Sequence, residues 1–224
     1  MASNKEALVL VLDVGQNMSL PANHRGDTYL DLALECVSWI VSRKILAESK
    51  DEVALVLFGC EETQNPLMEN DQYLNIAVAR EMQLTDFELS KYLANIVASA
   101  IEGDFLDALV VALEVMREGT EGKKFGAFQI VLLSNLGGDL RDQRFNKIAQ
   151  TLARMGIDLN VIGPGEGGDQ SSDQSNDVGG ASSSTQQNGG GTKLERTAQM
   201  DIGEGVVRGL LDSEGVSGCS YTLM

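Results

Sequence analysis

One aspartate in this sequence stands where α/β proteins often place reactive or metal-binding carboxylates. The segment LVLDVGQNMS, residues 10–19, is an apolar run that stops at Asp13 and continues into a polar turn. Open α/β sheets bind ligands and metals outside the carboxyl ends of their buried strands. Asp13 could therefore act as a nucleophile in phosphoryl transfer or hydrolysis, or it could hold a cation.

The nucleophile hypothesis lacks its second partner. In hydrolases of this kind, a second acid two residues after the aspartate protonates the leaving group. Gly15 occupies that position and cannot transfer a proton. The sequence also lacks a nucleophile elbow and a Walker motif, so we predict that the chain is not an enzyme.

Other metal-binding or redox chemistry is not indicated. Cys36, Cys60 and Cys219 are an odd number without metal-ligand spacing, and His24 is the single histidine. This usage argues against a zinc site or a disulfide framework. We therefore expect no cofactor.

The charge balance excludes one large class of function. There are 33 acidic and 17 basic residues, which makes the net charge −16. An acidic surface repels phosphates, so the chain alone is not expected to bind duplex DNA. Its longest apolar runs are about eight residues, too short to span a bilayer, and no membrane partner is expected.

The elements that would position Asp13 alternate between strand and helix. Four short runs rich in Val, Ile and Leu, without polar alternation, indicate strands buried on both faces; they are residues 7–14, 52–59, 127–135 and 158–163. Between them, apolar residues recur at helical spacing. A mostly parallel, doubly wound α/β sheet with helices on both faces is predicted.

Weaker patterns are assigned within this framework. Residues 72–82 alternate partly and are expected to form an edge strand, and residues 84–98 a helix with Thr85 as its N-cap. Arg144, Lys147 and Arg154 share one side of another predicted helix, and we interpret them as a solvated basic face rather than a binding site.

The composition changes after Pro164. Residues 165–193 are Gly, Ser, Asn, Gln and Asp with almost no large apolar side chain, which predicts a flexible loop. Apolar spacing then returns, and a short helix at about 202–212 is expected to cover the sheet again. Residues 1–224 would thus form a single domain with an internal loop.

The strand ending in aspartate, the long helix and the strand DEVALVLFG resemble the opening of a von Willebrand factor A domain. That family holds a metal with an Asp-x-Ser-x-Ser motif, a threonine in a later loop and an aspartate after the fourth strand. Here Asp13 is kept, but Gly15 and Asn17 replace the serines, and the loops at 103–105 and 134–137 lack the threonine and the aspartate. Magnesium needs about six oxygen ligands. We therefore expect no metal at Asp13.

A narrower resemblance covers roughly residues 7–165. The segments AESKDEVALVLFGCEETQNPL, DQYLNI and GDFLDALVVALEVM are similar to the N-terminal domains of the Ku family of DNA-end-binding proteins, on the side of the larger subunit. The resemblance implies a nuclear, chromosome-associated role in double-strand break repair by non-homologous end joining, in DNA recombination and in telomere maintenance. It also implies a longer protein, in which a β-barrel encircles DNA and pairs with the smaller subunit. The alternative is another degenerate A domain, such as the proteasome ubiquitin receptor or a transcription-factor-IIH subunit.

In the Ku family this domain receives short basic-then-aromatic peptide motifs. The resemblance therefore implies docking of aprataxin-and-PNK-like factor, the XLF ligation factor and the Werner helicase. Matching the family's groove onto this chain selects these residues: Leu67, Tyr73, Asp104 and Val110, with Leu109 and Met116 nearby. Asp104 and the preceding Glu102 would pair with Lys or Arg, and the apolar residues would form the floor. For Leu109 and Met116 we favour the alternative that they are core residues of an amphipathic helix.

Overall fold

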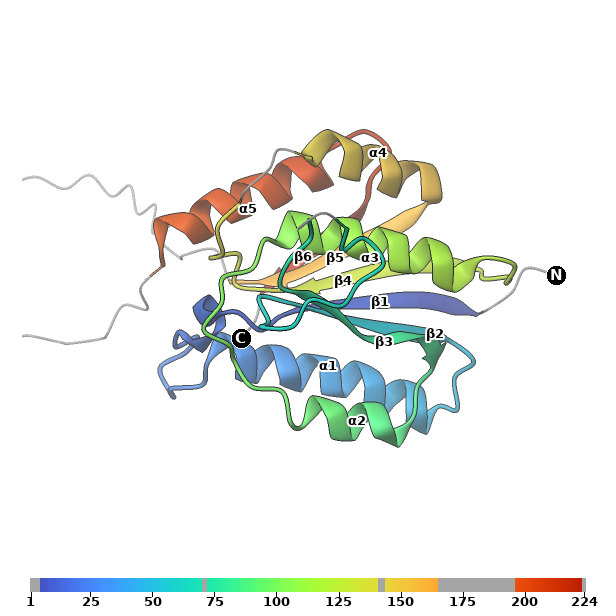
Figure 1. The fold of residues 1–224 in the computed structure, drawn as a ribbon, viewed down its shortest axis with the longest axis horizontal. Helices are drawn as coiled ribbons and strands as arrows, with labels where there is room; N and C mark the ends of the chain where they lie inside the picture. The colour runs from blue at the N-terminus through green and yellow to red at the C-terminus, as the bar shows by residue number, and fades with distance from the viewer. Residues whose placement is uncertain (1–4, 70–71, 141–143, 165–195, 223–224) are drawn as a thin grey trace, which may run out of the picture.

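The part of the chain described by the computed structural model, residues 5–69, 72–140, 144–164 and 196–222, forms one six-stranded sheet (Figure 1). The strand order is β3-β2-β1-β4-β5-β6, and each neighbouring pair is parallel except the antiparallel pair of β2 and β3. The strands are β1 (Glu6–Asp13), β2 (Glu52–Phe58), β3 (Ile76–Leu84), β4 (Ala127–Leu133), β5 (Ile157–Gly163) and β6 (Ser217–Thr222).

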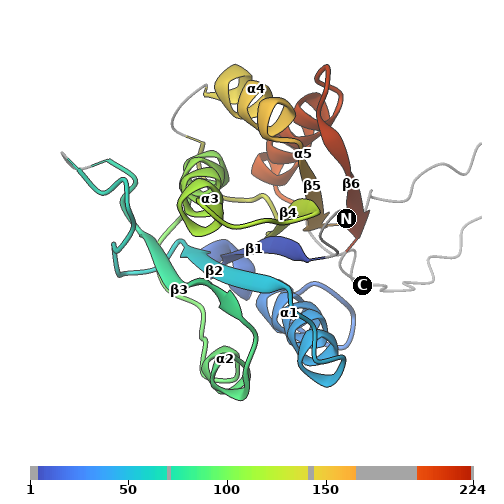
Figure 2. The ribbon, with the colours of Figure 1, turned by 90° about the vertical axis from the view of Figure 1, so that its right-hand side faces the viewer.

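Helices cover both faces of this sheet, which confirms the predicted von Willebrand factor A architecture. In Figure 2, α1 and α2 lie on one face, and α3, α4 and α5 on the other. The helices are η1, a short 3-10 turn (Gln16–Ser19), α1 (Tyr29–Leu46), α2 (Phe87–Leu93), α3 (Phe105–Thr120), α4 (Phe145–Met155) and α5 (Ala198–Leu211). Among the described residues, no helix has the length and apolar character needed to cross a membrane.

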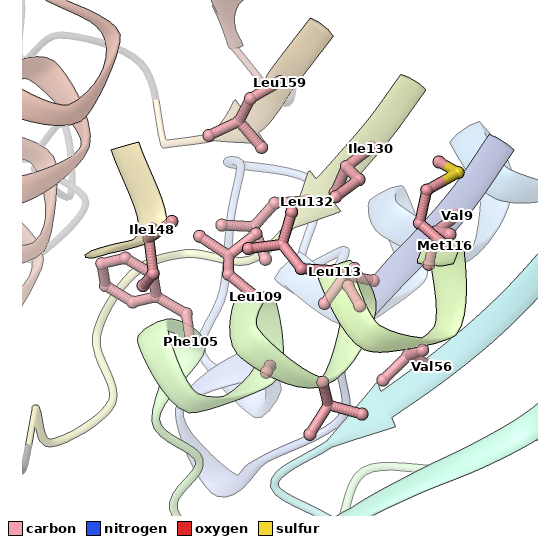
Figure 3. Close-up of a cluster of buried hydrophobic side chains, with 14 of the residues drawn as sticks. Val9, Val56, Phe105, Leu109, Leu113, Met116, Ile130, Leu132, Ile148 and Leu159 are labelled. Carbon is pink, nitrogen blue, oxygen red and sulfur yellow. The ribbon is translucent and has the colours of Figure 1, made fainter. Parts of the chain in front are cut away.

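The central strands are apolar without alternation because both of their faces are buried. Every residue of β2, and every residue of β1 after Glu6, is buried. Alternate residues of β1 face two separate clusters, so Val9 packs toward α3 whereas Leu10 packs toward α1. Figure 3 shows the α3 side, where side chains of that helix meet those of β1, β2 and β4.

Three boundaries differ from those predicted. The edge strand β3 continues to Leu84, and the helix expected over 84–98 is shorter because α2 begins at Phe87 and ends at Leu93. Its N-cap is Asp86 rather than Thr85, because the Asp86 carboxylate accepts the Leu89 N–H. The helix expected at about 202–212 begins at Ala198, and β6 was not predicted. The loop expected at 165–193 lies outside the described residues.

Candidate functional site

Asp13 lies at the point where the sheet changes its winding direction. It ends β1, and Ser134 follows the neighbouring strand β4, while the helices after these two strands cover opposite faces. Open α/β sheets bind ligands at such a switch point. The side chains that surround Asp13 therefore decide what this edge of the sheet can bind.

Neutral donors hold the buried Asp13 carboxylate, which is 1% exposed. Its Oδ1 accepts the Gly15 N–H at 2.8 Å, and its Oδ2 accepts Asn17 Nδ2 at 2.9 Å and Ser134 Oγ at 2.6 Å. Burial raises the pKa of Asp13 to about 6, although the three hydrogen bonds act in the opposite direction. The carboxylate is thus satisfied by hydrogen bonds from its own neighbours.

A pair of asparagines extends this network. Asn17 Nδ2 also donates to Asn135 Oδ1 at 2.5 Å, and Asn135 Nδ2 donates to the Asn17 carbonyl at 2.7 Å. Both protons of the Asn17 amide are therefore used. Its buried Oδ1 has no hydrogen-bond partner among the described residues.

The residues around Asp13 do not fit the cation that other von Willebrand factor A domains hold there. A Cβ at Gly15 would lie 2.8 Å from Asn17 Oδ1 and 2.8 Å from the Ile101 carbonyl, so a serine would clash at this position. N–H groups, which cannot ligate magnesium, point at the carboxylate. Within the described ranges, no group of three or more His, Cys, Asp or Glu side chains could hold a metal.

The second candidate site begins in the loop between β2 and β3, which Asn65 organises. Asn65 is 7% exposed, and its Nδ2 donates to the carbonyls of Tyr73 at 3.0 Å and of Ile76 at 2.9 Å. Its Oδ1 accepts the Leu67 N–H at 3.0 Å. One buried amide thus fixes the backbone of two predicted groove residues, Leu67 and Tyr73.

Tyr73 is connected to α3 and to the start of α4 through Arg144. The guanidinium of Arg144, at the start of α4, lies 4.9 Å from the centroid of the Tyr73 ring and donates to the Tyr73 hydroxyl. Arg144 Nη1 also lies 3.8 Å from Asp107 Oδ1, on the first turn of α3. Arg144 was interpreted as part of a solvated face, and this is wrong; Lys147 and Arg154 are exposed as expected.

The structure separates the predicted apolar residues into two groups. Leu67, Tyr73 and Val110 are half-buried and pack against the core on its α3 side. Leu109 and Met116 are only 1% and 0% exposed, and both point from α3 into the core (Figure 3). The core interpretation holds for Leu109 and Met116, so neither side chain can contact a ligand in this conformation.

Asp104 was predicted to be a partly exposed partner for a basic ligand, and the prediction that it is exposed is wrong. It is 8% exposed, and its Oδ1 accepts the N–H groups of Leu106 at 2.8 Å and of Asp107 at 3.4 Å, which makes it the N-cap of α3. Asp107 is half-buried and lies one turn from Val110. It is therefore the better placed carboxylate, and Glu102 is exposed.

A separate groove lies along the second half of α3, and of the site residues named above only Asn65 lines it. It has a volume of about 480 Å³ and is formed by the β2–β3 loop, β3 and the second half of α3. Figure 2 shows the loop and β3 beside α3. Its wall combines the apolar side chains of Met68, Val78 and Val115 with the carboxylates of Glu81 and Glu118. Lys123 also lines it, but its ammonium group is paired with Glu52 at 2.7 Å. An apolar floor with acidic side chains suits a ligand that is both hydrophobic and basic.

Three residues of this site were missed by sequence reasoning, namely Asn65, Asp107 and Arg144. The Asn65-Pro66 dipeptide is a turn signal that could have identified Asn65. Asp107 could have been found from helical spacing, three residues before Val110. No local signal connects Arg144 to Tyr73, since they are 71 residues apart in the chain.

The fold and the altered Asp13 site define a von Willebrand factor A domain without the metal-binding motif. Among solved structures, the SpRpn10 VWA domain is similar with a TM-score of 0.56 and 13% identity, covering 98% of this chain and 89% of that one. BatB from Bacteroides thetaiotaomicron is similar with a TM-score of 0.56 and 16% identity, covering 96% of this chain and 89% of that one. At these identities the similarity shows the fold alone.

Sequence comparison identifies the family. Residues 7–176 match the Ku70/Ku80 N-terminal alpha/beta domain. The chain belongs to this family, as the von Willebrand factor A-like domain of the larger subunit. X-ray repair cross-complementing protein 5 of Xenopus laevis is 35% identical over 161 residues, 71% of this chain and 22% of that protein. ATP-dependent DNA helicase 2 subunit KU80 of Oryza sativa subsp. japonica is 33% identical over 174 residues, which cover 72% of this chain and 23% of that protein. The chain thus spans less than a quarter of either relative's length.

Proposed function

We propose that this chain is a non-enzymatic peptide-docking domain, which recruits end-processing and ligation factors to DNA double-strand breaks. The observation that carries the proposal is the pairing of Leu67 and Tyr73 on one buried support, Asn65, next to Val110 and Asp107 of α3. Two half-buried apolar side chains and a carboxylate supply an anchor pocket and a charge for a basic-aromatic motif.

The partners follow from family membership and remain part of the proposal. Aprataxin-and-PNK-like factor, the XLF ligation factor and the Werner helicase would dock here through such motifs. The smaller Ku subunit and DNA ends would bind other parts of a longer protein, in the nucleus. The acidic charge of this chain, −16, suits a domain that binds basic peptides and leaves DNA to a separate surface.

The test is a calorimetric titration with a basic-aromatic Ku-binding peptide. Leu67→Arg places a guanidinium in the apolar floor and repels a basic ligand, so binding should be nearly abolished. Leu74→Arg is the matched control: it makes the same substitution in the same loop at a side chain that is 45% exposed, and it should bind like the parent. Circular dichroism checks that both variants are folded. Equal affinities of the Leu67 variant and the parent would place the groove elsewhere.

A further inference from the structure

Arg144, the N-cap residue of α4, is held against Tyr73 and Asp107 in a way that the basic residues within the helix are not. Its guanidinium lies over the Tyr73 ring, and its Nη1 both donates to the Tyr73 hydroxyl and lies 3.8 Å from Asp107 Oδ1; its side chain is 30% exposed. Lys147 and Arg154 lie on the same helix and are exposed. Arg144 thus joins the β2–β3 loop to α3 and α4.

The contacts of Arg144 are those that a basic ligand would make. A guanidinium over a tyrosine ring gains a cation–π interaction, and a nearby carboxylate adds an ion pair. Tyr73 and Asp107 offer both at one point, one helical turn from Val110 on α3. A ligand cation that bound there would have to take the place of the Arg144 guanidinium.

We propose that Arg144 is an intramolecular occupant of the cation position formed by Tyr73 and Asp107, and that a docking peptide binds by displacing it from these two residues. This inference rests on the proposed peptide-docking function. It adds that Arg144 lowers the affinity for the peptide, because the peptide's Lys or Arg must replace this cation instead of filling an empty position. Peptides without a basic residue gain nothing from such an exchange.

The experiment compares two charge-removing variants of α4 in the same calorimetric titration. Arg144→Gln removes the guanidinium from Tyr73 and Asp107 and should tighten binding of the basic-aromatic peptide by about three- to ten-fold, the range expected for losing one exposed cation–π contact and one ion pair. Arg154→Gln removes the same charge from an exposed position of the same helix. It should change affinity by less than about two-fold.

A second peptide, in which each Lys and Arg is replaced by Gln, assigns the effect to the cation position. Its affinity should be weaker than that of the basic peptide and should not rise in Arg144→Gln. If the gain persisted with this neutral peptide, Arg144 would merely cover apolar surface, and the inference would be overturned.

The remaining outcomes separate the inference from the function beneath it. If the parent binds the basic peptide and Arg144→Gln binds it equally or more weakly, Arg144 supports the groove instead of occupying it. Only the inference then fails. Amide hydrogen exchange at Leu67 and Asn75 would show in that case whether the loop had loosened. If neither protein binds the peptide, the docking function and the inference fail together.

Discussion

Asn17 Nδ2 donates a hydrogen bond of 2.9 Å to Oδ2 of Asp13. The same amide group reaches Asn135, so two asparagines and a buried carboxylate form one network at the end of β1. Asn17 stands where the metal-binding motif has a serine. Instead of a hydroxyl oxygen that could share a cation with Asp13, it directs an N–H donor at the carboxylate. The carboxylate has become part of the packing of these loops, which leads to the first two predictions.

Asp13 should make the stability of the domain depend on pH between about 4 and 6. Its pKa is raised by burial to about 6 in the folded state, so the folded protein binds this proton more tightly than the unfolded chain. The stabilisation is complete below about pH 4 and is lost as the pH rises through 6, by up to roughly 3 kcal/mol. Urea unfolding across this range should show the loss in the parent.

Asp13→Asn should not show this pH-dependent loss of stability between about pH 4 and 6, although the substitution lowers stability at every pH. Other carboxylates have the opposite sign: the hydrogen bond from Arg80 lowers the pKa of Asp86, for example, so its contribution is lost in acid. Because such groups are common to both proteins, the difference between the two profiles isolates Asp13. Parallel profiles, or an Asp13 carboxyl carbon signal that titrates near pH 4, would contradict the assignment.

Restoring a serine at Gly15 should not restore a metal site. The Cβ of Gly15→Ser would press on Asn17 and on the backbone of Ile101, and we expect a loss of about 1–3 kcal/mol in stability. Gly205→Ser, in α5 with open space around it, is the control and should be nearly neutral. Neither the parent nor Gly15→Ser should show saturable amide shifts at residues 13–19 with magnesium up to about 1 mM. Saturation below that concentration would show that the site still binds a cation.

Asp104 should contribute to stability more than to peptide binding. Asp104→Ala removes the N-cap of α3 and should cost at least about 1 kcal/mol in urea unfolding. Asp104→Asn keeps a side-chain acceptor and should cost less. Peptide affinity should change little in the asparagine variant. A large, salt-sensitive loss of affinity in Asp104→Asn, with unchanged stability, would return Asp104 to the role of a ligand partner.

Asn65 should be required for the groove although it touches no ligand. Asn65→Ala removes the side chain that bonds the Tyr73 and Ile76 carbonyls and the Leu67 N–H, although the Ile76 carbonyl keeps the Gln64 N–H as a donor. Exchange of the loop amides should therefore accelerate, and peptide affinity should fall several-fold. Asn95→Ala removes an exposed side chain whose amide, in the described structure, bonds only to the Lys91 carbonyl, and it should bind like the parent. Normal affinity in Asn65→Ala would mean that the loop is fixed by other contacts.

The fold was predictable where burial leaves a pattern in the sequence. β1 and β2 are apolar because they are covered on both faces, and α3 carries helical spacing. Burial on both faces was also predicted for the other two inner strands, and this is wrong for β5, whose residues alternate between buried and half-buried, and for the first half of β4. β6 carries neither signal, since all of its residues are exposed. The N-cap of α2 was assigned to Thr85 because a capping box fits there, but β3 continues through Leu84, the N-cap is Asp86 and the helix begins at Phe87.

The site was only partly predictable because its contacts are not local. Leu67 and Tyr73 were selected through family resemblance and a loop-like sequence, and both are half-buried beside α3. Asp104 was misjudged because a helix cap and a ligand-binding carboxylate are the same residue type in sequence. The contact of Arg144 with Tyr73 depends on how α4 packs against the β2–β3 loop, which hydrophobic periodicity does not encode.

The exposed strand β6 sets a limit on the cooperative folding unit. It joins the sheet through its parallel pairing with β5, and its side chains are exposed from Ser217 to Thr222. Detaching it would uncover little apolar surface of its own, whereas detaching β1 or β4 would open both cores. β6 is therefore a unit of low local stability at the edge of a more stable sheet. It can detach and re-form in sub-global fluctuations while the loops around Asp13 and Tyr73 stay folded.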